Sequence, residues 1–145
     1  MLRGISTIIG PELLVVLHRM GHGDEIVLAD AYFPGESCGK RVVRADGLPI
    51  ADLLGGILPL ICLDSYVDHP VVMMDAVSGD KLDEMVAKAY RREIDKYCPN
   101  TPDIQRLERY AFYERARHAF AVVMTGETAK YGNVILRKGV ITNNA

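Results

Sequence analysis

Two titratable side chains near the N-terminus, His22 and Asp30, are of types that could exchange protons with a small ligand. His22 lies between Gly21 and Gly23, so a ligand could approach the bare backbone on either side of the imidazole. Imidazole titrates close to neutrality, which suits a group that must both donate and accept protons. Asp30 ends an apolar run at residues 26–29, and ligands collect at the carboxyl ends of strands in α/β sheets.

The spacing between these two residues limits how they could act together. His22 and Asp30 are eight residues apart, and a fully extended segment of that length spans roughly 26–29 Å. They can serve one small ligand only if the segment before the strand doubles back, or if two copies of the chain build the pocket. The sequence leaves both arrangements open, and the second predicts a homo-oligomer.

A third group of candidates lies in the last third of the chain. Arg109 begins a stretch rich in Arg and Tyr, and Tyr131-Gly132-Asn133 follows a loop at residues 126–130. Arg supplies a fixed fork of donors, Tyr a hydroxyl and Asn an amide, which together suit a polyhydroxylated ligand. Tyr131-Gly132-Asn133 is also an ordinary turn composition. In the same way, His22 could be an exposed turn residue, and Asp30 could cap a helix or satisfy a loop.

No familiar metal, nucleotide or nucleophile motif accompanies these candidates. His18 and His22 have the i, i+4 spacing of a zinc-binding helix, but the glycine between them is expected to end that helix. Cys38, Cys62 and Cys98 have no C-x-x-C spacing, which predicts free thiols in a reducing cytoplasm. The chain also lacks the Gly-x-Gly-x-x-Gly, Gly-Lys-Ser/Thr and Gly-x-Ser-x-Gly motifs. We therefore expect neither a metal nor a cofactor.

Alternating helices and strands are expected to position these residues. Apolar periodicity predicts helices over residues 11–20, 49–60, 82–97 and 113–119, although Gly55 and Gly56 weaken the second. Strands are predicted over residues 25–30, 41–45, 70–77, 120–125 and 134–138, and residues 31–40 read as a loop. Interleaved helices and strands indicate one compact α/β domain over residues 1–145, with a mainly parallel or mixed sheet flanked by helices.

Composition and charge restrict the partners. The 145 residues are 49% hydrophobic and 25% charged, which is ordinary for a soluble globular domain. A net charge of −2 offers no broad positive field, so we expect no nucleic-acid partner. The longest apolar stretches, residues 50–63 and 119–125, are shorter than the roughly 20 residues of a membrane span. With no secretory signal visible, the expected location is the cytoplasm.

An ordered set of short segments runs through about residues 1–140, leaving residues 67–103 unmatched. Its members are Pro11-Glu12-Leu13-Leu14, Met20-Gly21-His22-Gly23-Asp24-Glu25-Ile26, Ala29-Asp30, Phe33-Pro34, Arg44-Ala45-Asp46-Gly47, Asp64-Ser65-Tyr66, Phe112-Tyr113-Glu114-Arg115-Ala116, Ala119-Phe120-Ala121, Thr125-Gly126-Glu127, Tyr131-Gly132-Asn133 and Lys138-Gly139-Val140. Together they resemble the RbsD/FucU family of sugar mutarotases, and most closely its L-fucose mutarotase branch. The chain departs from the family at Tyr32, where bacterial relatives often carry histidine.

The resemblance implies a site, a fold and an activity. His22 corresponds to the family's acid/base histidine and Asp30 to its active-site aspartate, whereas Arg109 and Tyr131-Gly132-Asn133 fall on positions that contact the sugar. The family has a compact α/β fold, called RbsD-like, and uses no cofactor. It implies an isomerase that binds a monosaccharide, here L-fucose, and interconverts its anomers. It also implies a homo-oligomer, commonly a decamer of two stacked pentameric rings.

The residue chemistry agrees with such an activity. Anomers interconvert when one group protonates the ring oxygen while another takes the proton of the anomeric hydroxyl, and the roles reverse on closure. We expect His22 to exchange the proton and Asp30 to hold or deprotonate a hydroxyl, with Tyr131 as an alternative second group. Two other functions remain open at this point, a ribose pyranase-type mutarotase and a non-catalytic sugar-binding accessory subunit that would not need His22. A purely structural ring-forming protein would bind no sugar saturably.

Overall fold

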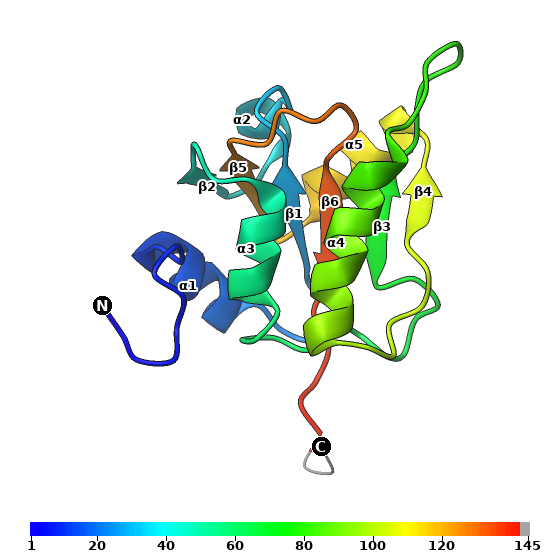
Figure 1. The fold of residues 1–145 in the computed structure, drawn as a ribbon. Helices are drawn as coiled ribbons and strands as arrows, with labels where there is room; N and C mark the ends of the chain where they lie inside the picture. The colour runs from blue at the N-terminus through cyan, green and yellow to red at the C-terminus, as the bar shows by residue number, and fades with distance from the viewer. Residues whose placement is uncertain (143–145) are drawn as a thin grey trace.

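The computed structural model describes residues 1–142, so the last three residues of the domain expected over 1–145 lie outside the described residues (Figure 1). The strands are β1 (Glu25–Ala29), β2 (Val42–Ala45), β3 (Val71–Met74), β4 (Gln105–Leu107), β5 (Ala121–Thr125) and β6 (Val134–Arg137). The helices are α1 (Pro11–Arg19), α2 (Gly35–Cys38), α3 (Ile50–Ile57), α4 (Glu84–Tyr97) and α5 (Arg109–His118). None of these helices is long and apolar enough to pass through a bilayer.

The six strands form one mixed sheet in the order β2-β5-β1-β6-β3-β4. Strand β6 is antiparallel to both of its neighbours, β1 and β3, and the other pairings are parallel. In Figure 1, β1 and β3 therefore run upward while β6 runs downward between them. The expected α/β domain with a mixed sheet flanked by helices is confirmed.

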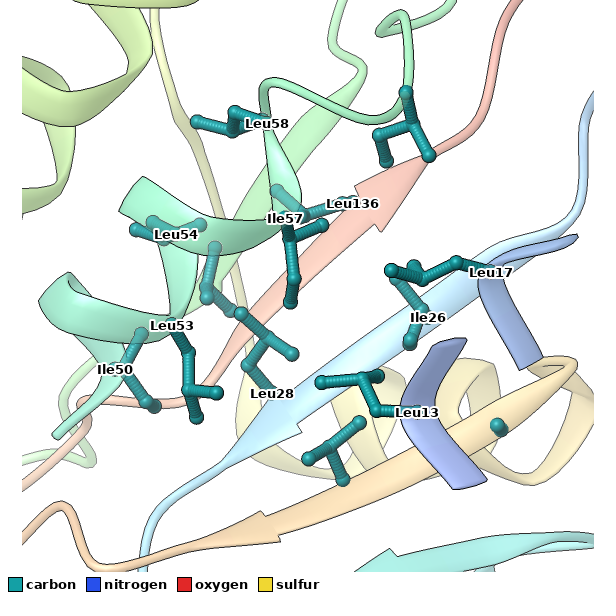
Figure 2. Close-up of a cluster of buried hydrophobic side chains, with 14 of the residues drawn as sticks. Leu13, Leu17, Ile26, Leu28, Ile50, Leu53, Leu54, Ile57, Leu58 and Leu136 are labelled. Atoms are coloured by element: carbon teal, nitrogen blue, oxygen red, sulfur yellow. The ribbon is translucent and has the colours of Figure 1, made fainter. Parts of the chain in front are cut away.

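Helices cover both faces of the sheet, as the nearly continuous burial of the side chains of β1, β3 and β5 requires. On one face, α1, α3 and α4 pack on a cluster that includes Ile26 and Leu28 of β1 and Leu136 of β6. Figure 2 shows side chains of α1 and α3 meeting these strand residues. On the other face, Phe112 of α5 packs on a second cluster with Val27 of β1. Strand β1 is thus buried on both sides, which fixes the positions of the residues at its two ends.

Several predicted elements differ in extent from those in the structure; strand β3, for example, covers Val71–Met74 rather than residues 70–77. Helix α5 begins at Arg109, four residues before the predicted start, because the Glu108 side chain caps it by accepting the Ala111 N–H at 3.1 Å. The predicted loop at residues 31–40 contains the short helix α2. Helix α3 forms despite its two glycines and ends at Ile57. A Cβ on Gly56 would lie 2.9 Å from the Ile9 side chain, so the glycine lets Ile9 pack closely against the helix.

The loop that carries residues 126–133 is held close to the turn before α3. A Cβ added to Gly126 would lie 2.6 Å from the backbone of Gly47, so no side chain fits there. We expect Gly126→Ala to lower the free energy of unfolding by about 1–3 kcal/mol, the usual cost of overpacking. Gly55→Ala is the matched control, because its Cβ would meet only the flexible end of Glu93, at 3.2 Å, within a helix that favours alanine.

Urea denaturation of the two glycine variants at one protein concentration checks this expectation. Loss of stability in both variants, or in neither, would contradict the close approach of the two backbones.

Candidate active site

A cavity of about 230 Å³ lies at the carboxyl ends of β1 and β3. Its lining combines polar groups with apolar and aromatic surface, as small-molecule sites do. The lining residues are Asp30, Tyr32, Phe33, Met74, Val77, Arg109, Tyr113, Lys130, Tyr131 and Asn133. Four of the residues singled out from the sequence therefore meet here, although they come from separate parts of the chain.

Asp30 follows the last residue of β1 and is buried, with 6% of its surface exposed. Its N–H donates to Oδ1 of Asn133 at 2.7 Å, and its Oδ1 accepts the N–H of Tyr32 at 3.0 Å. Burial raises the pKa of the Asp30 carboxyl above its ordinary value, and the charge of Glu127 adds to this, although hydrogen bonds from Tyr32, Phe33 and Asn133 oppose it. Asp30 is thus a carboxylate of increased basicity that faces a cavity.

Arg109, the first residue of α5, brings an unpaired donor to the same cavity. Its Nη2 donates to the Tyr110 hydroxyl at 2.9 Å, and the guanidinium lies 4.7 Å from the centre of the Tyr110 ring. Its Nε is buried and finds no hydrogen-bond partner within residues 1–142. A buried donor without a partner is costly. An acceptor oxygen of a bound ligand would satisfy it.

The three residues of the segment Tyr131-Gly132-Asn133 make different contacts. Tyr131 has a positive φ of 56°, and its hydroxyl donates to Oδ2 of Asp80 at 2.7 Å. Asn133 is buried beside Asp30, as described above. Gly132 does not line the cavity, because its carbonyl accepts the Tyr90 hydroxyl at 2.7 Å. A Cβ on Gly132 would lie 2.9 Å from the Ala129 oxygen, so this glycine lets the loop pack closely.

His22 lies at the opposite end of the sheet, in the turn between α1 and β1. Gly23 has a φ of +86°, and its N–H donates to the Lys138 carbonyl at 2.8 Å. The Lys138 ammonium in turn donates to the carbonyls of Leu17 and Met20, at 2.8 and 2.6 Å, where α1 ends. A cation is favourable at this negative end of a helix. The turn that presents His22 is therefore fastened to the end of β6.

The imidazole of His22 has a buried carboxylate as its partner. Its Nε2 lies 3.1 Å from Oδ1 of Asp64, and Nε of Arg137 donates to Oδ2 of Asp64 at 2.9 Å. Burial alone would raise the pKa of Asp64, but hydrogen bonds from the Tyr66 N–H, Arg137 and His22 outweigh it and lower that pKa. The Tyr66 ring lies 5.4 Å from the imidazole. The His22 side chain itself is 44% exposed.

His22 and Asp30 of one chain cannot reach the same small ligand. The five residues of β1 separate them, a length of roughly 16 Å at about 3.3 Å per residue, and the connecting segment does not double back. Of the two arrangements that the sequence left open, a pocket within one chain is therefore excluded. Joint action of the two residues on one ligand would therefore need a second copy of the chain.

Sequence reasoning did not assign a role to Asp64 or Arg137. Asp64 lies 42 residues from His22 and reaches it only because Leu63 pairs with Lys138 beyond the end of β6. A signal was present, since Asp64 ends the apolar run at residues 60–63 as Asp30 ends that at residues 26–29. The apolar wall of the cavity, formed by side chains such as Phe33 and Met74, was also not foreseen.

Comparisons with known proteins match nearly the whole chain. The model of the RbsD / FucU transport protein family matches residues 3–141. The chain is 54% identical to an L-fucose mutarotase of Histophilus somni over 140 residues, which cover 97% of each protein. It superposes on the fucose mutarotase of Streptococcus pneumoniae, solved in complex with L-fucose, with a TM-score of 0.90 and 46% identity over 97% of this chain and 100% of that one. FucU from Bifidobacterium longum gives a TM-score of 0.92, at the same identity and coverage.

Proposed function

Because the chain belongs to the RbsD / FucU family, we propose that it is an L-fucose mutarotase, an isomerase that interconverts the α and β anomers without a cofactor. The relatives from Histophilus somni and Streptococcus pneumoniae support this activity, since both match over nearly their whole length. The observation that carries the proposal is the cavity lined by both Asp30, a carboxylate of raised pKa, and Arg109, whose Nε has no hydrogen-bond partner among residues 1–142. The mutarotase domain comprises residues 1–145.

The binding groups suit a small polyol. The neutral hydroxyls of a sugar can accept from the Arg109 guanidinium and donate to the Asp30 carboxylate. The ring of Tyr131 and the side chains of Phe33 and Met74 offer apolar surface to the C–H face of the sugar. The volume of about 230 Å³ is below the 300–1,000 Å³ of typical drug-sized pockets, which favours a monosaccharide.

The reaction needs a base at the anomeric hydroxyl and an acid at the ring oxygen. Asp30 takes the proton of the anomeric hydroxyl as the bond between the anomeric carbon and the ring oxygen breaks. Protonated His22 gives its proton to the ring oxygen, which leaves an open-chain aldehyde. After rotation about the neighbouring C–C bond, His22 takes this proton back, the ring oxygen attacks the other face of the aldehyde, and Asp30 returns its proton to the carbonyl oxygen.

Asp30 suits the base role better than Tyr131, the alternative second group. The raised pKa of Asp30 brings its basicity closer to neutral pH, where general base catalysis is most efficient. The Tyr131 hydroxyl, by contrast, already donates to Asp80, which also accepts from Lys130 at 2.8 Å. We therefore assign Tyr131 to holding the sugar together with Arg109 and Asn133. Gly132 supports that segment from behind the cavity.

We infer that the acid comes from a second copy of the chain, because one chain holds His22 and Asp30 at opposite ends of β1. Exposed aromatic side chains lie at both ends, which supports burial of these surfaces against another protein surface. Tyr66, beside His22, is 75% exposed, and Tyr32, at the cavity, is also 75% exposed. We propose that the His22 end of one copy covers the cavity of the next.

A contact between two different surfaces repeats from copy to copy until it closes into a ring. We therefore propose a homo-oligomeric ring, and a decamer of two stacked pentameric rings is the assembly that the family resemblance favours. A cytoplasmic location is proposed as well, in keeping with the three free cysteines, Cys38, Cys62 and Cys98. Neither a nucleic acid nor a membrane is proposed as a partner.

Saturation-transfer NMR on the anomeric protons of L-fucose tests the activity directly. We expect catalytic amounts of the protein to speed exchange between the α and β signals without changing their equilibrium ratio. D-Ribose, measured in the same way, checks for pyranase activity. Saturable binding of L-fucose without faster exchange would contradict the proposal and indicate a sugar-binding accessory subunit. No binding at all would indicate a structural ring protein.

Removing the unpaired donor tests the placement of the sugar. We expect Arg109→Ala to weaken L-fucose binding by about 10- to 100-fold, the value of a hydrogen bond to a charged group. Arg44→Ala is the control, because Arg44 is exposed and pairs with Glu36 and Asp46 on the surface. Titration calorimetry of both variants with L-fucose provides the measurement. Equal affinities for the two variants would contradict contact between Arg109 and the sugar.

A further inference from the structure

The carboxylate behind His22 has no part in the reaction as derived so far, although it is the most deeply buried charged group at that end of the sheet. Asp64 is 1% exposed. Its Oδ1 accepts the N–H of Tyr66 at 3.0 Å and faces Nε2 of His22, while its Oδ2 accepts from Arg137. In each of these contacts the Asp64 carboxylate is the hydrogen-bond acceptor, because an ionised carboxylate has no hydrogen to donate.

These contacts determine which nitrogen of His22 carries the proton. The lowered pKa of Asp64 keeps it ionised near neutral pH, so it has no hydrogen to donate to the imidazole. The short distance of 3.1 Å is then a hydrogen bond only if Nε2 of His22 carries the proton. In the neutral imidazole, Nδ1 is left with the lone pair. In the imidazolium, Nδ1 carries the additional proton.

Resting on the proposed mutarotase function, we propose that Asp64 is a positioning residue that holds neutral His22 as the Nε2–H tautomer and leaves Nδ1 to exchange the proton with the sugar ring oxygen. The side chain acts through His22 and does not touch the substrate. A carboxylate behind an imidazole orients the ring and stabilises the imidazolium that forms during proton transfer. The structure shows both requirements, a fixed carboxylate and a half-exposed imidazole.

The backbone around Asp64 is built to keep its carboxylate in place. Its N–H donates to the Arg137 carbonyl at 2.9 Å, and the Gly139 N–H donates to the Cys62 carbonyl at 2.7 Å. A Cβ on Gly139 would lie 2.8 Å from Cα of Asp64, so the two segments are in direct contact. The backbone that carries Asp64 is therefore held in place, and the Tyr66 N–H and Arg137 bind the carboxylate itself. The imidazole of His22 therefore meets a carboxylate whose position is set by other contacts.

The first test needs no variant of Asp64. Nitrogen-15 NMR of the imidazole nitrogens in the assembled wild-type protein reports which nitrogen carries the proton, and His22→Ala identifies the His22 signals among the four histidines. At a pH where His22 is neutral, we expect a protonated Nε2 and an unprotonated Nδ1. A protonated Nδ1, or an equal mixture of tautomers, would overturn the proposal.

The second test measures what the tautomer contributes. Asp64→Asn keeps the shape of the side chain, but its amide can donate as well as accept, so it no longer selects one tautomer. We expect kcat for L-fucose exchange to fall about 10- to 100-fold, as for other groups that orient a functional histidine, with KM nearly unchanged. The NMR signals of His22 should shift towards a mixture of tautomers. Unchanged kcat with an unchanged tautomer would overturn the proposal.

Glu25→Gln is the control for the loss of a half-buried, hydrogen-bonded carboxylate. Glu25 lies on β1 near the same end of the sheet and makes two hydrogen bonds with Arg115, at 3.0 and 2.6 Å, but no contact with a histidine is found for it in the described chain. We expect Glu25→Gln to keep the wild-type kcat. An equal fall in kcat for both variants would show a general structural effect and would overturn the specific role of Asp64.

These tests separate the inference from the proposed function. If the wild-type protein does not speed anomer exchange, the proposed function fails, but the tautomer of His22 is still measured and decides whether Asp64 positions it. If exchange is catalysed and the tautomer is Nδ1–H, the function stands and the role of Asp64 fails.

Discussion

Replacing His22 by alanine is expected to lower kcat for L-fucose anomer exchange by about 10²–10⁴-fold, the usual contribution of a general acid and base. L-Fucose should still bind, because Asp30, Arg109 and Asn133 remain in a cavity that His22 of the same chain does not line. The variant should still fold, because the buried Asp64 carboxylate keeps its hydrogen bonds from Arg137 and the Tyr66 N–H when it loses His22. Saturation-transfer NMR gives kcat, and titration calorimetry gives the affinity for L-fucose.

His118→Ala serves as the control for this variant. His118 is exposed at the end of α5, where its Nδ1 lies 2.9 Å from the Glu114 carbonyl, and it takes no part in the cavity. It should keep the wild-type kcat. A His22→Ala protein that exchanges anomers as fast as the His118→Ala protein would remove His22 from the mechanism.

Replacing Asp30 by asparagine is expected to abolish most of the activity and, at neutral pH, to stabilise the folded protein. The activity falls because an amide cannot take a proton from the anomeric hydroxyl, a loss of about 10²–10⁴-fold. The stability rises because the buried carboxylate is costly to ionise, as its raised pKa shows, whereas an amide of the same shape carries no charge. A loss of activity together with a gain in stability is common when an active-site residue is replaced.

The stability difference between Asp30→Asn and the wild type should increase as pH rises. The pKa of Asp30 is raised in the folded protein above its ordinary value of 3.8, so the folded state holds this proton more strongly than the unfolded state does. As pH rises from about 3.8 through the folded-state pKa, the wild-type protein loses stability relative to Asp30→Asn. At lower pH, where both states are protonated, the contribution of ionisation disappears and the difference should no longer change with pH.

Thermal denaturation at several pH values and one protein concentration measures this difference, with Asp52→Asn as the control. Asp52 is exposed on α3 and lies outside the cavity, so its replacement removes a carboxyl group without changing the buried one. An Asp30→Asn protein that is less stable than the wild type at neutral pH would contradict a costly buried charge at Asp30.

Local sequence signals were enough to predict most of the elements of the fold. Apolar runs gave β1 and β5, and Pro11 marked the first turn of α1. The differences arise where contacts between residues far apart in the sequence affect the local structure. At Gly56, for example, the lack of a side chain lets Ile9 pack closely against helix α3. The strand order could not be predicted either, because it depends on which strands pair across the whole chain.

The candidate site was predictable by residue type but not by arrangement. Asp30, Arg109, Tyr131 and Asn133 meet in one cavity because β1 and β6 pair side by side and α5 begins at the same end. The contact between Asp64 and His22 depends on a pairing beyond β6, and nothing in the local sequence of either residue encodes it. Sequence spacing alone did establish that His22 and Asp30 need either a folded-back segment or two chains.

Mixing two inactive variants tests most directly whether two copies of the chain build each site. His22→Ala and Asp30→Asn chains, co-expressed in equal amounts, should form mixed rings in which some cavities with an intact Asp30 meet an intact His22 from the neighbouring copy. For random mixing, about one quarter of the sites would be complete. We therefore expect about a quarter of the wild-type kcat per chain from the mixture, although each variant alone is nearly inactive. Anomer exchange in the mixture no faster than in the separate variants would contradict a site shared between copies.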